Sequence, residues 1–365
     1  MTEVAARAYP YAPDHVLPPG ETLAECLEAL GMTQTELAKR TGLSVKHVNQ
    51  IVNGSAPITP DTALSLEKAT KVPARVWNAL EMAHREYVSR QDEEKSFAAD
   101  VDWLNELPIR QLITRGVLEK GRNPADQVRH VCEFFGVANR SAWVSLWQKP
   151  TMYRRSKAFA SDPGAVAAWL RIGEIAAADL DCEEFDRAQF TGVVSEARAL
   201  TREMDPRVWF PRLVDMCSAA GVAIVLKPEL KGARINGAAR WLTPNKALIQ
   251  LSLRHRWSDI LWFTFFHEAA HLVLHSKRET FINDTGQHSG VEQEADAFAA
   301  ETLIPRRFEA DLSTIETTLD AEEFASRVGI SAGIVVGRLQ HEGRWPFSAG
   351  NSLKQRLVFS TAATG

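Results

Sequence analysis

The chain has 365 residues, of which 45% are hydrophobic and 24% charged, a composition that excludes a disordered or fibrous protein. This length predicts about two to three domains. The formal net charge of −4 excludes a global nucleic-acid signature, so any DNA binding must rest on a local surface. With no long uncharged apolar run and no basic start followed by an apolar stretch, we expect neither a membrane span nor a secretory signal. Four widely spaced cysteines without a C-x-x-C pair favour free thiols in the reducing cytoplasm and disfavour a cysteine zinc site; these are Cys26, Cys132, Cys182 and Cys217.

Residues 15–90 are predicted to form a five-helix bundle. The expected helices are Glu21–Leu30, Thr33–Arg40, Ser44–Asn53, one starting at Thr59-Pro60, and one that turns Val76, Trp77, Leu80 and Ala83 inward. Thr33 with Glu36 has the spacing of a capping box, and Ser44 is a typical N-cap. A short helix, a turn at Gly42 and a short polar helix form the helix-turn-helix pattern. Its small core is predicted at Leu37, Ala38, Val48 and Ile51.

The third helix of this bundle carries side chains that can reach base edges or phosphates in a major groove. The predicted DNA-contacting residues are Gln34, Ser44, Lys46, His47, Asn49, Gln50 and Asn53. The alternative is a protein-interaction bundle that does not touch DNA, because the seven basic residues of 15–87 do not outnumber the acidic ones. A reader of one half-site commonly dimerises, so a homodimer is possible.

This region is similar to a known family of DNA-binding domains. The matching residues are Pro18–Leu23, Thr33–Ser44 and Ile51–Gly54. They resemble the phage-repressor-like (XRE) helix-turn-helix family, and within it the HigA-type antitoxins. The resemblance implies binding to double-stranded operator DNA.

Residues 91–205 are predicted to form a helical spacer or sensor region. The charged stretch Gln91–Ala99 is expected to be a connector. Helices are expected at about 124–136, 140–148, 164–178 and 183–203. Tryptophans at helical spacing are typical of a core, and no catalytic constellation occurs here; they are Trp103, Trp143, Trp147 and Trp169.

Residues 206–312 carry the chemistry. A helix at Val208–Ala219 and three strands at 221–226, 235–242 and 246–251 predict an α+β domain with a small sheet. An apolar helix follows, Ser258–His275, capped by Ser258. It contains His267 and His271, four residues apart on one helical face and able to share a metal ion, with Glu268 placed to take a proton from a metal-bound water. This is the arrangement of a zinc metallopeptidase, although five letters alone can also occur by chance.

A second helix, Val291–Pro305, follows a polar loop at Ser276–Gly290. A catalytic zinc ion needs a third protein ligand, and Glu292 is the candidate. Asp296, one turn further on, can receive the spare N–H of a ligand histidine and so determine its tautomer. Glu294 lies on the other side of the helix and is expected to be a solvated surface charge.

Two stretches of this region, Trp262–His275 and Glu292–Ala300 with the following Leu303-Ile304-Pro305, resemble the ImmA/IrrE family of zincin-like metallopeptidases. The resemblance implies a Zn²⁺ ion bound by His267, His271 and Glu292, with Glu268 as general base. It also implies limited cleavage of a protein substrate such as a repressor or antitoxin. Ala270 stands where the family usually has glycine. Every tyrosine lies outside this region, so an oxyanion donor would have to be His255, His288, an arginine or a tyrosine of another domain.

Residues 313–365 are predicted to be a helical tail. Glu323–Val335 repeats the pattern of Glu36–Val48, but its third helix shows Gly333, Ile334 and Val336 in place of polar readers. It is therefore expected to pack against the peptidase domain rather than to contact DNA. The run Leu353–Phe359 predicts a closing strand or helix.

The predicted fold class is a mainly α multidomain protein, comprising the helix-turn-helix bundle, the helical middle region, the zincin-like α+β domain and the helical tail. Two functions remain open. One is a cytoplasmic DNA-binding regulator with zinc-dependent endopeptidase activity. The other is a regulator or antitoxin without proteolysis, whose zinc domain senses a metal, a ligand or a partner; Glu268 favours the enzyme, because a sensor needs the ligands but not the base.

Overall fold

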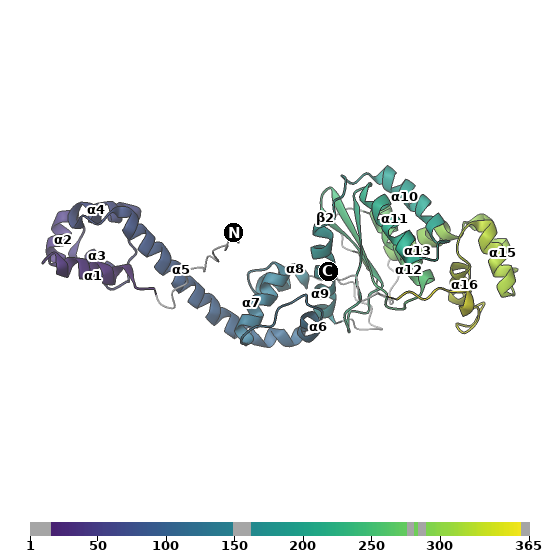
Figure 1. Cartoon of the computed structure of the whole chain (residues 1–365), viewed down its shortest axis with the longest axis horizontal. Helices are drawn as coiled ribbons and strands as arrows, with labels where there is room; N and C mark the ends of the chain where they lie inside the picture. The colour runs from purple at the N-terminus through teal and green to yellow at the C-terminus, as the bar shows by residue number, and fades with distance from the viewer. Residues whose placement is uncertain (1–15, 149–161, 276–280, 284–289, 359–365) are drawn as a thin grey trace, which may run out of the picture. The chain divides into compact units, whose positions relative to one another are not determined.

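The computed structural model describes residues 16–148, 162–275, 281–283 and 290–358. Internal contacts divide the chain into two compact units, Met1–Ala99 and Asp100–Gly365. Figure 1 shows the helices and strands of both. The protein is mainly helical, as the sequence predicts. Among the described residues, none of the helices has the length and apolar character needed to cross a membrane.

The N-terminal unit contains the five predicted helices: α1 Pro19–Ala29, α2 Gln34–Thr41, α3 Val45–Val52, α4 Pro60–Thr70 and α5 Ala74–Ala99. Side-chain caps start three of them, because the Thr33, Ser44 and Thr59 hydroxyls each accept a backbone N–H of the first turn. Gly42 ends α2 with φ 75°, a left-handed conformation that favours glycine. The predicted core residues Leu37, Ala38, Val48 and Ile51 are all buried, together with Trp77.

The expected connector Gln91–Ala99 is helical, because this stretch is the last part of the 26-residue helix α5. Charge alone does not break a helix when opposite charges lie one turn apart. Arg90 pairs with Glu86 at 2.9 Å and Lys95 with Asp92 at 2.8 Å along its surface. Phe97 is buried near its end.

The second unit is built around a sheet with helices on both faces. Its helices before the metal motif are α6 Ile109–Thr114, α7 Pro124–Phe135, α8 Arg140–Trp147, α9 Pro163–Ala178, α10 Arg187–Leu200 and α11 Pro206–Ser218, with a 3₁₀ turn at Val101–Glu106. The motif helices are α12 Ser258–Leu274 and α13 Gly290–Leu303. After them come 3₁₀ turns at Arg306–Phe308 and Asn351–Leu353 and the helices α14 Glu309–Leu312, α15 Thr318–Val328 and α16 Ala332–His341.

The sheet of the described residues has four strands in the order β1-β3-β2-β4. These are β1 Val222–Leu226, β2 Gly237–Thr243, β3 Lys246–Leu251 and β4 Phe281–Asn283. β1 runs parallel to β3, whereas β2 is antiparallel to both β3 and β4. The first three strands match the predicted ones, but β4 falls in the stretch predicted as a polar loop. A three-residue strand is too short for a recognisable alternation of residue types.

Alternate residues of β1 enter two separate cores, as the pleat requires. Val222 and Ile224 belong to the large core under α10–α13, whereas Ala223 and Val225 face the opposite side. Helix α9 covers that opposite side and contacts β1 and β3. It comes from the predicted middle region, so part of that region completes the sheet domain (Figure 1).

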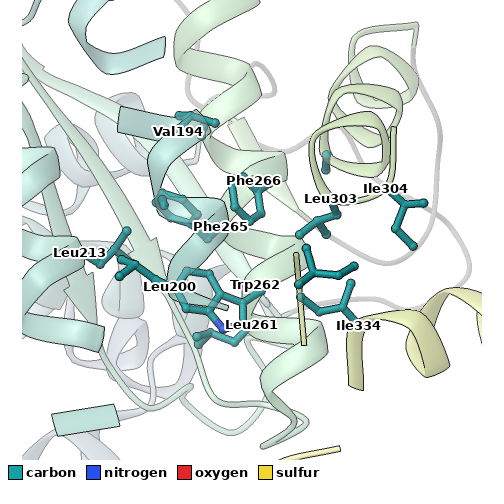
Figure 2. Packing of buried hydrophobic residues seen from close by; sticks show 14 of the residues in the cluster. Val194, Leu200, Leu213, Leu261, Trp262, Phe265, Phe266, Leu303, Ile304 and Ile334 are labelled. Atoms are coloured by element: carbon teal, nitrogen blue, oxygen red, sulfur yellow. The ribbon is translucent and has the colours of Figure 1, made fainter. Parts of the chain in front are cut away.

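Helix α12 lies against β2 and β3 and is almost entirely buried. Its aromatic residues Trp262, Phe265 and Phe266 meet side chains from α10, α11, the end of α13 and α16 (Figure 2). The labelled neighbours in that view are Val194, Leu200, Leu213, Leu303, Ile304 and Ile334. The motif helix is therefore held by packing on several sides.

The tail contributes to this packing. Helix α16 contacts α12 and buries Ile334, Val335, Val336 and Leu339. The predicted closing element is reduced to the short 3₁₀ turn at Asn351–Leu353 and one antiparallel bridge between Trp257 and Arg356; Phe359 lies outside the described residues. That bridge overturns the predicted cap at Ser258. The N-cap is Trp257 without a side-chain bond, and the Ser258 backbone N–H donates to the Gln355 carbonyl at 2.9 Å.

Candidate metal centre

Helix α12 brings the three residues of the His-Glu-x-x-His motif into the interior. The side chains of His267 and His271 are 2% and 0% exposed, and Glu268 is 0% exposed. Polar groups buried this deeply need partners, since an unpaired buried polar group costs about 1–3 kcal/mol. Much of their pairing comes from α13, which packs along α12.

The ring nitrogens of the two histidines and the Glu292 carboxylate converge on one point. Nε2 of His267 lies 3.1 Å from Nε2 of His271 and 3.1 Å from Oε2 of Glu292. Nε2 of His271 lies 3.7 Å from Oε1 of Glu292. Ligands about 2.0–2.1 Å from a zinc ion in tetrahedral geometry are about 3.4 Å apart. The three residues therefore fit a zinc site, and their ligand atoms all lie within 4.8 Å of one another.

Asp296 holds the first of these histidines. Its Oδ1 lies 2.8 Å from Nδ1 of His267, so the ring donates from Nδ1 and keeps a lone pair on Nε2 for a metal. Burial lowers the pKa of His267, but the hydrogen bonds of Asp296 and Glu292 raise it more, to about 10 without a metal. Burial lowers the pKa of His271 to about 2, helped by the neighbouring His267 and His275.

A further contact reaches the second histidine. Nδ1 of His271 lies 3.0 Å from Nδ1 of His275, and Nε2 of His275 lies 3.1 Å from Oε2 of Glu294. Sequence reasoning assigned no role to His275 and expected Glu294 to be a solvated charge. The available signal was the repeat of histidine four residues after His271, the spacing that brings side chains together along one helical face.

Glu268 differs from every other carboxylate of the site. It is fully buried, and neither oxygen has a hydrogen-bond partner among the described residues. Burial raises the pKa of Glu268 to about 8 in the absence of a metal ion; the charge of His267 lowers this pKa, and the charge of Glu292 raises it. An acid whose pKa lies near neutrality can both accept and return a proton.

Strand β2 makes room for Glu268. A Cβ at Gly237 would lie 2.9 Å from Oε1 and Cγ of Glu268 and 2.5 Å from Cγ2 of Thr264. Real Cβ atoms essentially never come so close. The absence of a side chain at this position is therefore what lets the carboxylate lie against the strand.

The expected oxyanion donors are not assembled here. His255 is exposed in the loop between β3 and α12, and no contact of the described residues ties it to the centre. His288 lies outside the described residues. Tyr87, the one tyrosine that the structure describes, belongs to the N-terminal unit.

The predicted DNA-contacting residues lie on or next to α3 in the N-terminal unit. Four are exposed, namely Ser44, Lys46, Asn49 and Asn53, and three are half-buried, namely Gln34, His47 and Gln50. Asn49 Nδ2 donates to Gln34 Oε1 at 3.3 Å, and Asn53 Nδ2 donates to Asn49 Oδ1 at 2.9 Å. Ser44 Oγ accepts the His47 backbone N–H, so it serves as a helix cap. These contacts align an amide-rich face along α3.

Fold and site define a helix-turn-helix bundle joined to a domain with a buried His₂Glu centre. Comparison with protein families agrees. Residues 23–77 match the helix-turn-helix family model, and residues 234–340 match the IrrE N-terminal-like domain of the M78 peptidase family. The chain therefore carries an XRE-type helix-turn-helix domain followed by an ImmA/IrrE-like peptidase domain.

Similar solved structures include an addiction module antidote protein of the HigA family from Coxiella burnetii, at 32% identity and a TM-score of 0.22. The match covers 24% of this chain and 95% of that one. Another is described as an antidote protein of a plasmid maintenance system from Nostoc punctiforme, at 26% identity and a TM-score of 0.22, covering 23% of this chain and 91% of that one. No curated protein matches the chain.

Proposed function

We propose that the chain is a cytoplasmic transcriptional regulator that binds operator DNA through α3 and cleaves a protein substrate with a zinc-dependent peptidase centre. The observation that carries the enzymatic part is Glu268, a fully buried carboxyl group without a hydrogen bond beside three converging ligand atoms. Leaving such a group unpaired costs about 1–3 kcal/mol. A centre that only senses metal needs the three ligands but gains nothing from that cost.

His267, His271 and Glu292 would hold the zinc ion through Nε2, Nε2 and a carboxylate oxygen. A zinc ion bound there supplies a Lewis acid for the scissile carbonyl and lowers the pKa of its water toward neutrality. The Glu268 carboxylate accepts a proton from the attacking water and returns it to the departing amine nitrogen. Asp296 keeps the His267 ring in the tautomer that leaves Nε2 free to bind.

The proposed substrate is a repressor or antitoxin protein cut at one or a few sites. The DNA-binding unit supports this class, because it would bring the peptidase to the proteins of a transcriptional switch. Helix α3 offers amide side chains suited to adenine edges and Lys46 suited to phosphate. The N-terminal unit has no marked excess of positive charge, so tight binding is expected to need two copies.

The test uses full-length wild type and Glu268→Gln. Both are expected to bind one zinc ion per chain, measured by metal analysis, and both to shift DNA of the chain's own promoter at low salt. Only the wild type should cleave a candidate repressor encoded nearby, as followed by mass spectrometry. Cleavage that persists in Glu268→Gln would refute the assignment of Glu268 as the general base, whereas normal regulation of the target by that variant in cells would favour the sensor instead. A wild type that binds no promoter DNA would refute the regulatory half.

A further inference from the structure

Beyond the ligand residues, two groups lie next to the centre with no part in the proposed reaction. His275 follows the last turn of α12, with its side chain 10% exposed. Glu294 is on α13, two residues from the ligand Glu292, with its side chain 67% exposed. They join the centre through the contacts His271 Nδ1 to His275 Nδ1, at 3.0 Å, and His275 Nε2 to Glu294 Oε2, at 3.1 Å.

The contacts from His271 through His275 to Glu294 allow one consistent choice of the ring nitrogen that carries the hydrogen in each histidine. A neutral imidazole has one N–H and one lone pair. His271 must present its lone pair on Nε2, which faces Glu292 and His267, so its N–H is on Nδ1. Nδ1 of His275 then accepts that hydrogen, and the N–H of His275 is on Nε2, from which it donates to Glu294. All three groups are satisfied at once.

Helix α13 thereby serves both ligand histidines. Asp296 receives the N–H of His267 directly, at 2.8 Å. Glu294 receives the N–H of His275, which in turn accepts from His271. A partner that holds the second nitrogen of a ligand histidine orients the ring and increases its basicity.

Resting on the proposed zinc centre, we infer that His275, supported by Glu294, is a positioning residue that orients His271 for the metal. The buried contact to His275 carries most of the effect. Glu294 is largely exposed, and a hydrogen bond open to water contributes less.

The experiment measures the zinc affinity of the full-length chain by competition with a chromophoric chelator. His275→Phe keeps a ring of similar size but removes the acceptor, and zinc is expected to bind about 10–100-fold more weakly. His275→Asn restores an acceptor, since its Oδ1 is attached to Cγ as Nδ1 is in histidine. This variant should bind within a few-fold of the wild type. Glu294→Gln removes only an exposed charge and should bind zinc within a few-fold of the wild type, and Asp296→Asn serves as the positive control.

Glu301→Gln is the matched control, because Glu301 is an exposed carboxylate on the same helix whose partner is Arg306. Its affinity should be unchanged. The visible absorption bands of the Co²⁺-substituted protein give a second readout. They should shift in His275→Phe, where the His271 ring is free to reorient, and not in Glu301→Gln.

Each outcome has a separate meaning. If the wild type binds no zinc, both the proposed zinc centre and the proposed peptidase activity are refuted. If the wild type binds zinc and His275→Phe equals it within about twofold, the positioning role is overturned and the centre stands. If His275→Phe loses zinc as completely as His271→Ala does, His275 is itself a ligand, which also overturns the positioning role. If His275→Phe does not fold, His275→Leu, which also removes the acceptor, is compared with His275→Asn, and the positioning role requires His275→Leu to bind zinc more weakly.

Discussion

Lys354 and Asp259 form a buried ion pair, with Nζ 2.7 Å from Oδ2 and side chains 7% and 6% exposed. Nζ also donates to Oε1 of Gln340 at 2.7 Å. Asp259 stands in the first turn of the metal helix α12, where the partial positive charge of the helix N-terminus also favours a carboxylate. The pair therefore ties the end of the chain to the start of the helix that carries the motif.

Replacing Lys354 by Met should destabilise the second unit by about 3–5 kcal/mol, because it leaves a buried carboxylate without its cation. Urea unfolding followed by tryptophan fluorescence reports this unit, since Trp77 is the single tryptophan of residues 1–99. Adding Asp259→Asn should recover part of the loss. Arg207→Met, which removes an exposed pair with Asp205, should cost at most about 1 kcal/mol. If Lys354→Met and Arg207→Met lower the free energy of unfolding equally, the buried pair does not stabilise the unit more than an exposed one.

Gly237→Ala should damage the centre through sterics alone. The new Cβ would push Glu268 away from strand β2, and misplacing a catalytic group by about 1 Å can cost about 100-fold in rate. Cleavage of the substrate should fall by about that factor while zinc is retained. Gly192→Ala on α10 is the control, because its Cβ would meet nothing within 4 Å. It should stabilise the protein by about 0.5–1 kcal/mol and leave cleavage unchanged.

Acid should weaken the second unit partly through Asp126. Hydrogen bonds from the Arg122 side chain and backbone, and then from Arg129, hold the pKa of Asp126 well below its usual range. Because the folded-state pKa is the lower one, the stabilisation is complete above the unfolded pKa of about 3.9 and is lost as the pH falls toward the folded value.

Asp126→Asn should therefore be less stable than the wild type at neutral pH, and the difference should shrink below about pH 4. Urea midpoints measured from pH 7 to pH 2 test this, with the exposed Asp102→Asn as a control that should leave the difference flat. A difference in urea midpoint between Asp126→Asn and wild type that stays constant down to pH 2 would contradict the lowered pKa of Asp126.

Substitutions on α3 should affect two properties of DNA binding separately, namely its salt dependence and its sequence specificity. Lys46→Ala removes a phosphate contact and should lower the slope of log affinity against log salt by about 0.9. Asn49→Ala should cost about 1–3 kcal/mol on the operator and little on unrelated DNA. Fluorescence anisotropy at several salt concentrations measures both. Lys95→Ala on α5, whose cation pairs with Asp92, should leave the slope unchanged; the same change in all three variants would disprove an interface on α3.

The sequence alone determined what depends on neighbours within one or two helical turns. His267 and His271 lie on one face because residues four apart in a helix do so, and Glu292 and Asp296 share a face of α13 for the same reason. Caps at Thr33, Ser44 and Thr59 are likewise local, as is the left-handed turn at Gly42. Of the four strands in the described part of the chain, three could be located from their runs of apolar residues.

Only the tertiary structure decided which distant groups meet. The contact between Asp296 and His267 spans 29 positions, and that between Glu294 and His275 spans 19. Gly237 against Glu268, α9 on the second face of the sheet, and Lys354 on Asp259 are equally long-range. Such contacts arise from packing of whole elements, which no local periodicity records. Ser258 shows the limit most directly, since a typical N-cap residue became the first residue of the buried helix when the Gln355 carbonyl took its N–H.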